Sequence, residues 1–92
     1  MPEVRFLIRW PDGREESCYS PSTSIHEHLS AGQSYPLPEF LARSQAGLDQ
    51  AARRVEARFG FRCSSADAQA ASIRVRAAEF SPEETVTCLS MT

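Results

Sequence analysis

The sequence predicts an α+β protein in which a three-stranded sheet is covered on one face by two helices. Two observations carry this prediction: strand-like segments joined by a tight turn at the start of the chain, and long segments with helical spacing in its middle. A β-branched segment near the end completes the expected order β-β-(short helix)-α-α-β. Because 92 residues provide for one hydrophobic core, we expect a single domain over residues 1–92.

The first two strands are predicted from a hairpin signal. Apolar residues recur at every second position from Val4 to Trp10, which places them on one face of a strand. Asp12-Gly13 follows, and Asp-Gly between strand-like segments is a strong hairpin signal. Residues 14–19 are therefore expected to form the returning strand, and their polar character is typical of a sheet edge.

The long helix is predicted from Pro38 to Phe59. Proline suits the first turn of a helix, apolar residues then recur at helical spacing, and Gly60 stands where a C-terminal cap is expected. Acid-before-base pairs at a spacing of four residues support this helix. These pairs are Glu39 with Arg43 and Asp49 with Arg53. Before it, residues 24–29 are expected to form a short helical turn.

The second helix is predicted over residues 66–80, where apolar residues repeat at spacings of four and three. Ser64 and Asp67 resemble a capping box at its start. The alternative is a strand over residues 73–77, and we favour the helix because its stripe includes more residues. Residues 85–91 are β-branched and apolar, so a final strand is expected there, beside the first.

The predicted core lies between this sheet and the helix pair. Each member belongs to the apolar face of an expected element. The members are Val4, Phe6, Ile8, Leu41, Leu48, Val55, Phe59, Ile73, Phe80 and Leu89.

The composition excludes several classes of function. Twelve acidic and ten basic residues leave a net charge of −2, which gives no long-range attraction to nucleic acid or an anionic membrane. Arg5 and Arg9 interrupt the first apolar segment, so neither a signal peptide nor a membrane span is expected. Three widely spaced cysteines fit no disulfide framework and no paired zinc motif. We therefore expect free thiols in a cytoplasmic protein.

Cys18 is a candidate nucleophile at the end of the hairpin. A thiol needs a lowered pKa or a nearby base for this role, and His26 and His28 are the imidazole bases of the chain. A free cysteine is more often a small buried residue, which is the interpretation we favour. The two histidines lack the spacing of four residues that zinc-binding helical pairs use, so no metal and no cofactor is expected.

Basic and aromatic residues form two further sets of candidates. Arg53, Arg54, Arg58 and Arg62 cluster near the end of the long helix, where cations complement the helix dipole. The alternative is an anion site, because guanidinium groups bind carboxylates and phosphates in bidentate fashion. The interface candidates are Trp10, Tyr19 and Tyr35, which stand at strand ends and in a loop. Their alternative role is to flank the sheet as partly buried residues.

Several short sequence motifs, spread in order over nearly the whole chain, together resemble those of one protein family. They are Arg9-Trp10-Pro11-Asp12-Gly13, Glu16-Ser17-Cys18-Tyr19-Ser20-Pro21-Ser22, Ser34-Tyr35-Pro36-Leu37, Phe40-Leu41-Ala42-Arg43-Ser44, Arg54-Val55 and Phe59-Gly60-Phe61-Arg62-Cys63-Ser64. Their order and spacing resemble one family of small bacterial proteins of the nitrogen-starvation response.

The resemblance implies a role that is inferred from neighbouring genes. Members are typically encoded beside a nitrilase-like hydrolase, a radical-SAM protein, an acetyltransferase-like protein and a flavoprotein oxidoreductase, in clusters linked to nitrogen scavenging. The resemblance carries over no catalytic residue and no assigned activity. Within the matching motifs, the positions to test first are Cys18, Tyr19, Ser20, Tyr35, Arg43, Cys63 and Ser64.

Three hypotheses about function follow. The leading one is an accessory or protein-interaction module, acting as a homo-oligomer or in complex with a product of the same gene cluster, the nitrilase-like hydrolase first. The second is a small enzyme or carrier that uses Cys18 or Cys63, because both thiols lie in matching motifs. The third is a sensor of a small anionic metabolite that uses the arginines between Arg53 and Arg62.

Overall fold

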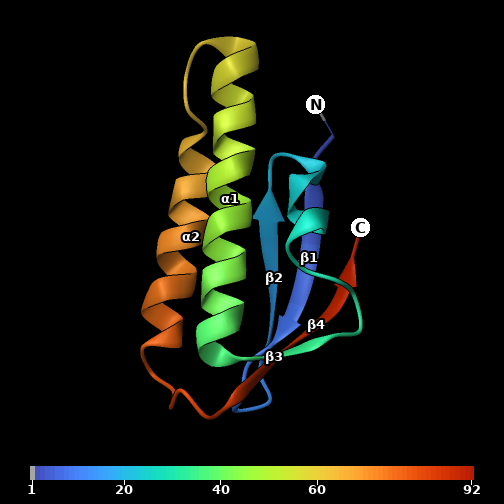
Figure 1. Cartoon of the computed structure of the whole chain (residues 1–92), viewed down its shortest axis with the longest axis vertical. Helices are drawn as coiled ribbons and strands as arrows, with labels where there is room; N and C mark the ends of the chain where they lie inside the picture. Colours follow the sequence, from blue (N-terminus) through green and yellow to red (C-terminus); the bar gives the residue numbers. More distant parts are fainter. Residues whose placement is uncertain (1) are drawn as a thin grey trace.

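A computed structural model describes residues 2–92 and shows an α+β fold with two α-helices and four antiparallel strands (Figure 1). The elements are β1 (Val4–Arg9), β2 (Glu15–Ser20), the 3-10 helix η1 (Thr23–Glu27), β3 (Ser34–Pro36), α1 (Leu37–Phe59), α2 (Ser64–Ala77) and β4 (Thr85–Met91). Both α-helices lie on the same side of the sheet. The predicted fold class is confirmed, but the sheet has four strands instead of three.

The strand order in the sheet is β2-β1-β4-β3, so the last strand lies beside the first, as predicted. The unpredicted strand is β3, in which Tyr35 pairs with Val86. The backbone extends this pairing, since the Cys88 N–H donates to the Gln33 carbonyl at 2.8 Å. Three residues that end in proline are too few to show a period of two, so pairing with β4 and not local sequence defines this strand.

The hairpin between β1 and β2 forms at the predicted turn. Gly13 has a φ of 89°, a value that favours glycine, and its N–H donates to the Trp10 carbonyl at 2.9 Å. The Trp10 N–H in turn donates to the Arg14 carbonyl at 2.8 Å. These two bonds set the register in which Phe6 lies opposite Cys18.

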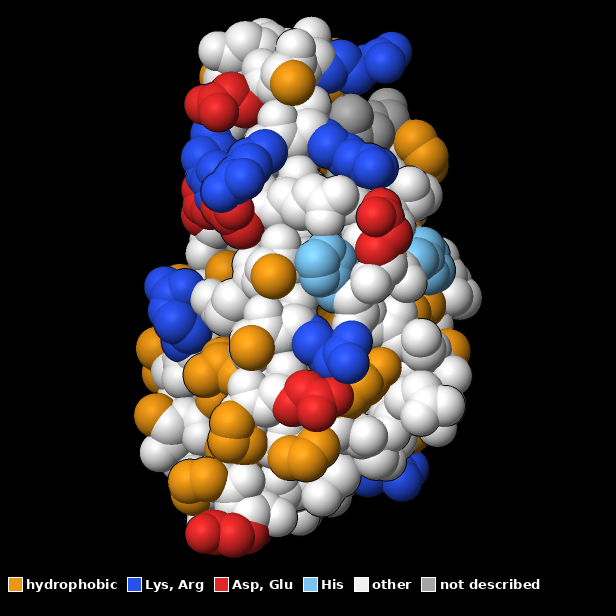
Figure 2. Space-filling model, in the orientation of Figure 1, with side chains coloured by type: hydrophobic (Ala, Val, Ile, Leu, Met, Phe, Trp, Pro, Cys, Tyr) orange, Lys and Arg blue, Asp and Glu red, His pale blue; other side chains and the backbone are white. Residues whose placement is uncertain are grey.

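Helix α1 ends at Gly60, as predicted. Gly60 has a φ of 84°, and its N–H donates to the Glu56 carbonyl at 2.8 Å. Both expected ion pairs form along α1, with distances of 2.9 Å for Arg43 to Glu39 and 3.0 Å for Arg53 to Asp49. Figure 2 shows acidic and basic side chains lying next to one another over this face of the molecule.

Residues 73–77 are helical, so the strand alternative is wrong and the predicted second helix is confirmed. The predicted capping box is wrong as well. Cys63 is the N-cap of α2 and makes no side-chain cap bond. The Asp67 carboxylate instead accepts hydrogen bonds from the Arg62 guanidinium, the closest at 2.9 Å. It therefore does not cap the start of α2.

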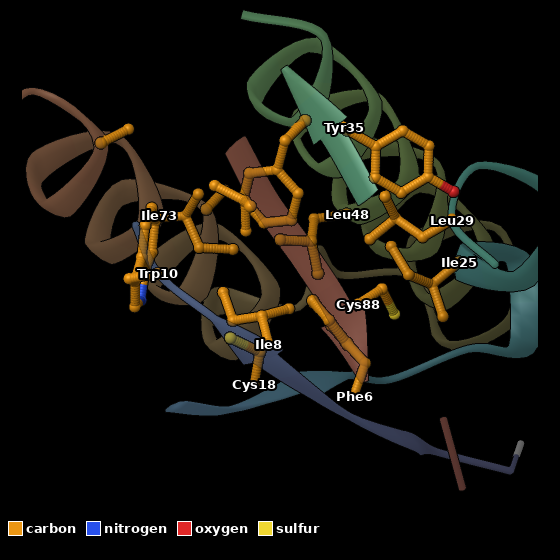
Figure 3. Close-up of a cluster of buried hydrophobic side chains, with 14 of the residues drawn as sticks. Phe6, Ile8, Trp10, Cys18, Ile25, Leu29, Tyr35, Leu48, Ile73 and Cys88 are labelled. Carbon is orange, nitrogen blue, oxygen red and sulfur yellow. The ribbon is translucent and has the colours of Figure 1, made fainter. Parts of the chain in front are cut away.

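The core lies between the sheet and the helices (Figure 3), and β1, β2, η1, β3, α1, α2 and β4 all contribute side chains to it. Six predicted members are buried, namely Val4, Phe6, Ile8, Leu48, Val55 and Ile73. Leu41 and Phe80 are partly buried against the cluster. Cys18 is fully buried, which agrees with its interpretation as a small buried residue. The cluster also contains residues outside the predicted core, namely Trp10, Ile25, Leu29, Tyr35, Leu37, Phe40, Ala70, Ala77, Val86 and Cys88.

Two predicted core residues lie elsewhere. Phe59 is 52% exposed, because the last turns of α1 extend beyond the sheet (Figure 1). Leu89 is only half-buried, because Val86 and Cys88 occupy the buried face of β4 and side chains alternate along a strand. The pairing of β4 with β1 shifts register beyond Cys88, so that Met91 and not Ser90 lies opposite Phe6.

The contrast between Leu48 and Phe59 is testable. Leu48 is 1% exposed, so Leu48→Ala is expected to lower the free energy of unfolding by about 2–5 kcal/mol. Phe59→Ala removes a larger side chain from the same stripe but from an exposed position, and is expected to cost roughly 1 kcal/mol or less. Urea unfolding of both variants measures the difference, and equal losses would contradict the placement of Phe59 outside the core.

Candidate functional site

Two exposed phenylalanines mark the end of α1. Phe59 is 52% exposed and Phe61 is 66% exposed, and their ring centroids lie 6.3 Å apart. They border a hollow of about 340 Å³, which we call the aromatic hollow. Its lining consists of Tyr19, Pro21, Val55, Phe59, Phe61 and Cys63. The hollow therefore joins the end of β2 to the connection between the helices.

The connection between α1 and α2 is held by one arginine. Arg62 Nη2 donates to Asp49 Oδ1 at 2.7 Å, and Arg62 Nε donates to Asp67 Oδ2 at 2.9 Å. The guanidinium thus links the body of α1 to the first turn of α2. The hydrogen bonds that Arg62 donates to Asp67 and Asp49 raise the pKa of Arg62 above its usual range, and the same bonds to Arg62 lower the pKa of Asp67. This pairing supports the segment that carries Phe61.

Three of the four arginines considered as an anion site are paired with carboxylates. Arg53 pairs with Asp49, Arg54 pairs with Glu27, and Arg62 pairs with two carboxylates. Arg58 forms no ion pair within residues 2–92, and its guanidinium lies 5.7 Å from the ring centroid of Phe59. Three of these charges are therefore already compensated, and the fourth lies over Phe59, which lines the aromatic hollow.

The two candidate cysteines have different surroundings. Cys18 is fully buried, and burial, followed by the charges of Glu16 and Cys88, raises the pKa of its thiol to about 12. Cys63 is half-buried and lines the aromatic hollow. Burial and the neighbouring Cys63 raise the pKa of the Tyr19 phenol. Of the two thiols, Cys63 is the one that a molecule in the hollow can reach.

His28 makes a structural contact. The His28 ring forms a hydrogen bond of 2.7 Å with the Gln50 side chain, which ties the segment after η1 to α1. Within residues 2–92, no group of three or more His, Cys, Asp or Glu side chains is placed to hold a metal ion. Among the same residues, no helix has the combination of length and hydropathy that crossing a bilayer requires.

Trp10 and Tyr35 are core residues and not surface anchors. Trp10 is 1% exposed, stacks on Phe80 with centroids 5.7 Å apart, and donates its indole N–H to Glu16 at 2.9 Å. Tyr35 is 7% exposed, and its hydroxyl accepts the Ser30 N–H at 3.0 Å. Both rings are buried and their polar atoms form hydrogen bonds, so neither side chain is available to a partner at the surface.

Tyr19 is half-buried and is the one interface candidate that lines the aromatic hollow. It also borders an open polar cleft of about 520 Å³ between β2 and α2. The Tyr19 N–H donates to the Gln69 side chain at 3.0 Å, so α2 covers this end of the free edge of β2. The Arg5 guanidinium lies 5.4 Å from the centroid of the Tyr19 ring.

Sequence reasoning missed Phe61 and misplaced Phe59. A signal was present in the glycine between them, because a helix that ends at Gly60 leaves Phe61 outside the apolar stripe. How much of Phe59 is covered depends on where the sheet ends relative to α1. Tertiary packing sets that position, so the sequence around Phe59 does not indicate it.

The fold and the aromatic hollow define a small α+β protein with two exposed phenylalanines beside a hollow at one end of its long helix. The chain belongs to the family described as nitrogen starvation-induced protein NitG, whose family model matches residues 5–91. This match confirms the family indicated by the short motifs of the sequence. Neither a curated protein nor a solved structure matches the chain.

The burial of the cysteines predicts selective labelling. Iodoacetamide at pH 8 is expected to modify Cys63 in the native protein, while Cys18 and Cys88 react only after unfolding, because both are fully buried. Mass spectrometry of the labelled peptides identifies the sites, and Cys63→Ser is the control that removes native labelling. Native labelling of Cys18 at the rate of Cys63 would contradict the burial of its thiol.

The raised pKa of Cys18 predicts a loss of stability at alkaline pH. The folded state holds the thiol proton up to about pH 12, whereas an unfolded thiol loses it near 9.0, so the stabilisation is present below pH 9 and is lost as pH rises towards 12. From pH 8 to pH 10, this group is expected to contribute a loss of about 1 kcal/mol in the free energy of unfolding. Urea unfolding of wild type and Cys18→Ala at both pH values isolates the contribution, and identical alkaline losses would refute it.

Proposed function

We propose that this protein is an accessory interaction module of the nitrogen-starvation response. It acts in the cytoplasm and binds a product of its own gene cluster through the aromatic hollow. The nitrilase-like hydrolase is the first candidate partner. Membership of a nitrogen starvation-induced family supports the setting of this proposal. The free thiols of Cys18, Cys63 and Cys88 are consistent with a reducing compartment.

One observation carries the proposal: Phe59 and Phe61 are large apolar side chains held next to each other in solvent. Burying a phenylalanine side chain fully is worth about 1.5–3 kcal/mol relative to leaving it exposed. Aromatic residues that fill a partner's pocket are typical anchors of protein interfaces. The hollow between these rings and Tyr19 offers a complementary recess for an apolar side chain of the partner.

The charges beside the hollow indicate the kind of surface that fits it. Arg58 lies against the Phe59 ring and has no carboxylate partner within residues 2–92. A partner surface with an apolar centre and an acidic rim would therefore match both the rings and this cation. The Arg62 bonds to Asp49 and Asp67 hold the loop before binding, which reduces the ordering cost of association.

The two alternative functions, an enzyme or carrier and an anion sensor, depend on fewer residues than the sequence suggested. A small enzyme or carrier would have to use Cys63, because the thiol of Cys18 is buried and its pKa is raised to about 12. Cys63 lines the aromatic hollow, so a carrier function would occupy the same surface. An anion sensor built on the arginines from Arg53 to Arg62 would have to displace the carboxylates that already bind Arg53, Arg54 and Arg62.

Co-expression with each product of the gene cluster tests the proposal. The wild-type protein is expected to co-purify with the nitrilase-like hydrolase, and replacing Phe59 and Phe61 together by serine is expected to weaken binding at least about thirtyfold, measured by calorimetry. Val75→Ser is the matched control, because Val75 is a third large exposed residue, 71% exposed on α2. It is expected to bind as wild type does.

Three outcomes would contradict the proposal. The first is that no cluster product is retained at micromolar concentration. The second is that the double serine variant binds as tightly as Val75→Ser. The third is that sedimentation shows a homo-oligomer that the same double variant disperses, which would assign the hollow to a second copy of this chain.

A further inference from the structure

A second apolar groove lies at the other end of α1, between the start of α1 and the end of α2. Its volume is about 290 Å³. The lining residues are Leu37, Pro38, Leu41, Arg74, Ala77, Ala78, Phe80 and Pro82. Figure 2 shows hydrophobic side chains gathered over these lower ends of the two helices. The 23 residues of α1 separate this groove from the aromatic hollow by about 30 Å, at 1.5 Å per residue.

Arg74 is the one charged side chain on the lining of the groove. Its Nη1 donates to Gln45 Oε1 at 2.6 Å, and the Gln45 amide donates in turn to the Ala70 carbonyl at 2.9 Å. A neutral side chain therefore holds the guanidinium in place. Within residues 2–92, Arg74 forms no ion pair, whereas Arg76 on the same helix pairs with Asp12 and Glu79. The positive charge of Arg74 is thus positioned but not compensated by a bonded carboxylate.

The rest of the groove is apolar and supported by the core. Ala77 is 4% exposed, and Phe80 stacks on the buried Trp10 with an angle of 13° between the rings. The Ala78 N–H donates to the Arg74 carbonyl, and the Phe80 N–H donates to the Ala77 carbonyl, both at 3.2 Å. These bonds satisfy backbone groups at the end of α2. Small alanine side chains leave the space that the surrounding larger residues enclose.

We propose that this groove binds a small organic carboxylate, with an acyl chain or aromatic ring in the groove and the carboxylate on Arg74. An apolar recess with one fixed polar group is the usual form of a small-molecule site, and about 290 Å³ is near the lower end of the range of roughly 300–1,000 Å³. Guanidinium binds carboxylate through charge-assisted hydrogen bonds. The proposal is independent of the partner that the aromatic hollow binds.

Titration of the ¹⁵N-labelled protein at pH 7 tests the chemical class of the ligand. Benzoate and hexanoate are the probes, benzamide and hexanamide are their neutral counterparts, and acetate supplies charge without an apolar body. The carboxylates are expected to shift the backbone amide signals of Leu41, Ala77, Ala78 and Phe80 and to saturate. Each is expected to bind about tenfold more tightly than its amide, as a charge-assisted bond requires, and acetate is expected to bind more weakly still.

Two variants separate the cation from the recess. Arg74→Gln is expected to remove the tenfold preference for carboxylate over amide, while Arg53→Gln, the same change at an exposed site on α1, keeps it. Ala78→Phe places a larger side chain at an exposed lining position and is expected to abolish the shifts without removing a core contact. The dispersion of the amide spectrum shows that each variant is folded.

Any of three results would overturn the proposal. Amides that bind as tightly as carboxylates would exclude recognition by Arg74. Shifts that survive Ala78→Phe would place the ligand elsewhere. Sedimentation that shows self-association of the wild type, abolished by Ala78→Phe, would assign the groove to a second copy of the chain.

Discussion

Burial of one face of the sheet against α1 is the constraint on which the rest of the structure depends. Phe6 and Ile8 of β1 and Cys88 of β4 are fully buried on that face, and Leu48 of α1 closes over them. The 3-10 helix η1 also packs closely against α1. A Cβ atom at Gly47 would lie 2.6 Å from Cδ1 of the buried Ile25, so glycine at this position lets η1 approach α1. One helix therefore organises both the sheet and the connection that leads to β3.

The length of α1 relative to the sheet explains why the candidate sites lie at the ends of the helix. Its last turns extend past the strands, and Phe59 and Phe61 consequently find no strand to cover them (Figure 1). At its start, α1 lies beside the end of α2, where small alanines and the stacked Phe80 leave a recess. Each end is held by an arginine in a defined geometry. Arg62 links two carboxylates at one end, and Arg74 rests on Gln45 at the other.

Charge pairing decides which arginines are available to a ligand. Arg53, Arg54 and Arg62 have carboxylate partners on their own surface, and exposed pairs of this kind contribute little to stability. Their main effect here is to orient side chains and to cancel a local positive potential. Arg58 and Arg74 form no ion pair within residues 2–92, and each stands beside exposed or recessed apolar surface. A cation next to apolar surface is the arrangement that favours a ligand or partner with both properties.

The sequence by itself determined the hairpin at Asp12-Gly13, the two helices and the place of the last strand beside the first, because turn chemistry and short-range periodicity are local properties. It also indicated the family that matches the chain. Only the tertiary structure decided that Trp10 and Tyr35 are buried and Phe59 is exposed, since burial depends on what other elements place around a side chain. For the same reason the sequence pointed to Cys63 and Tyr19 separately, while the hollow that joins them with Phe61 required β2 and the connection between the helices to meet in space.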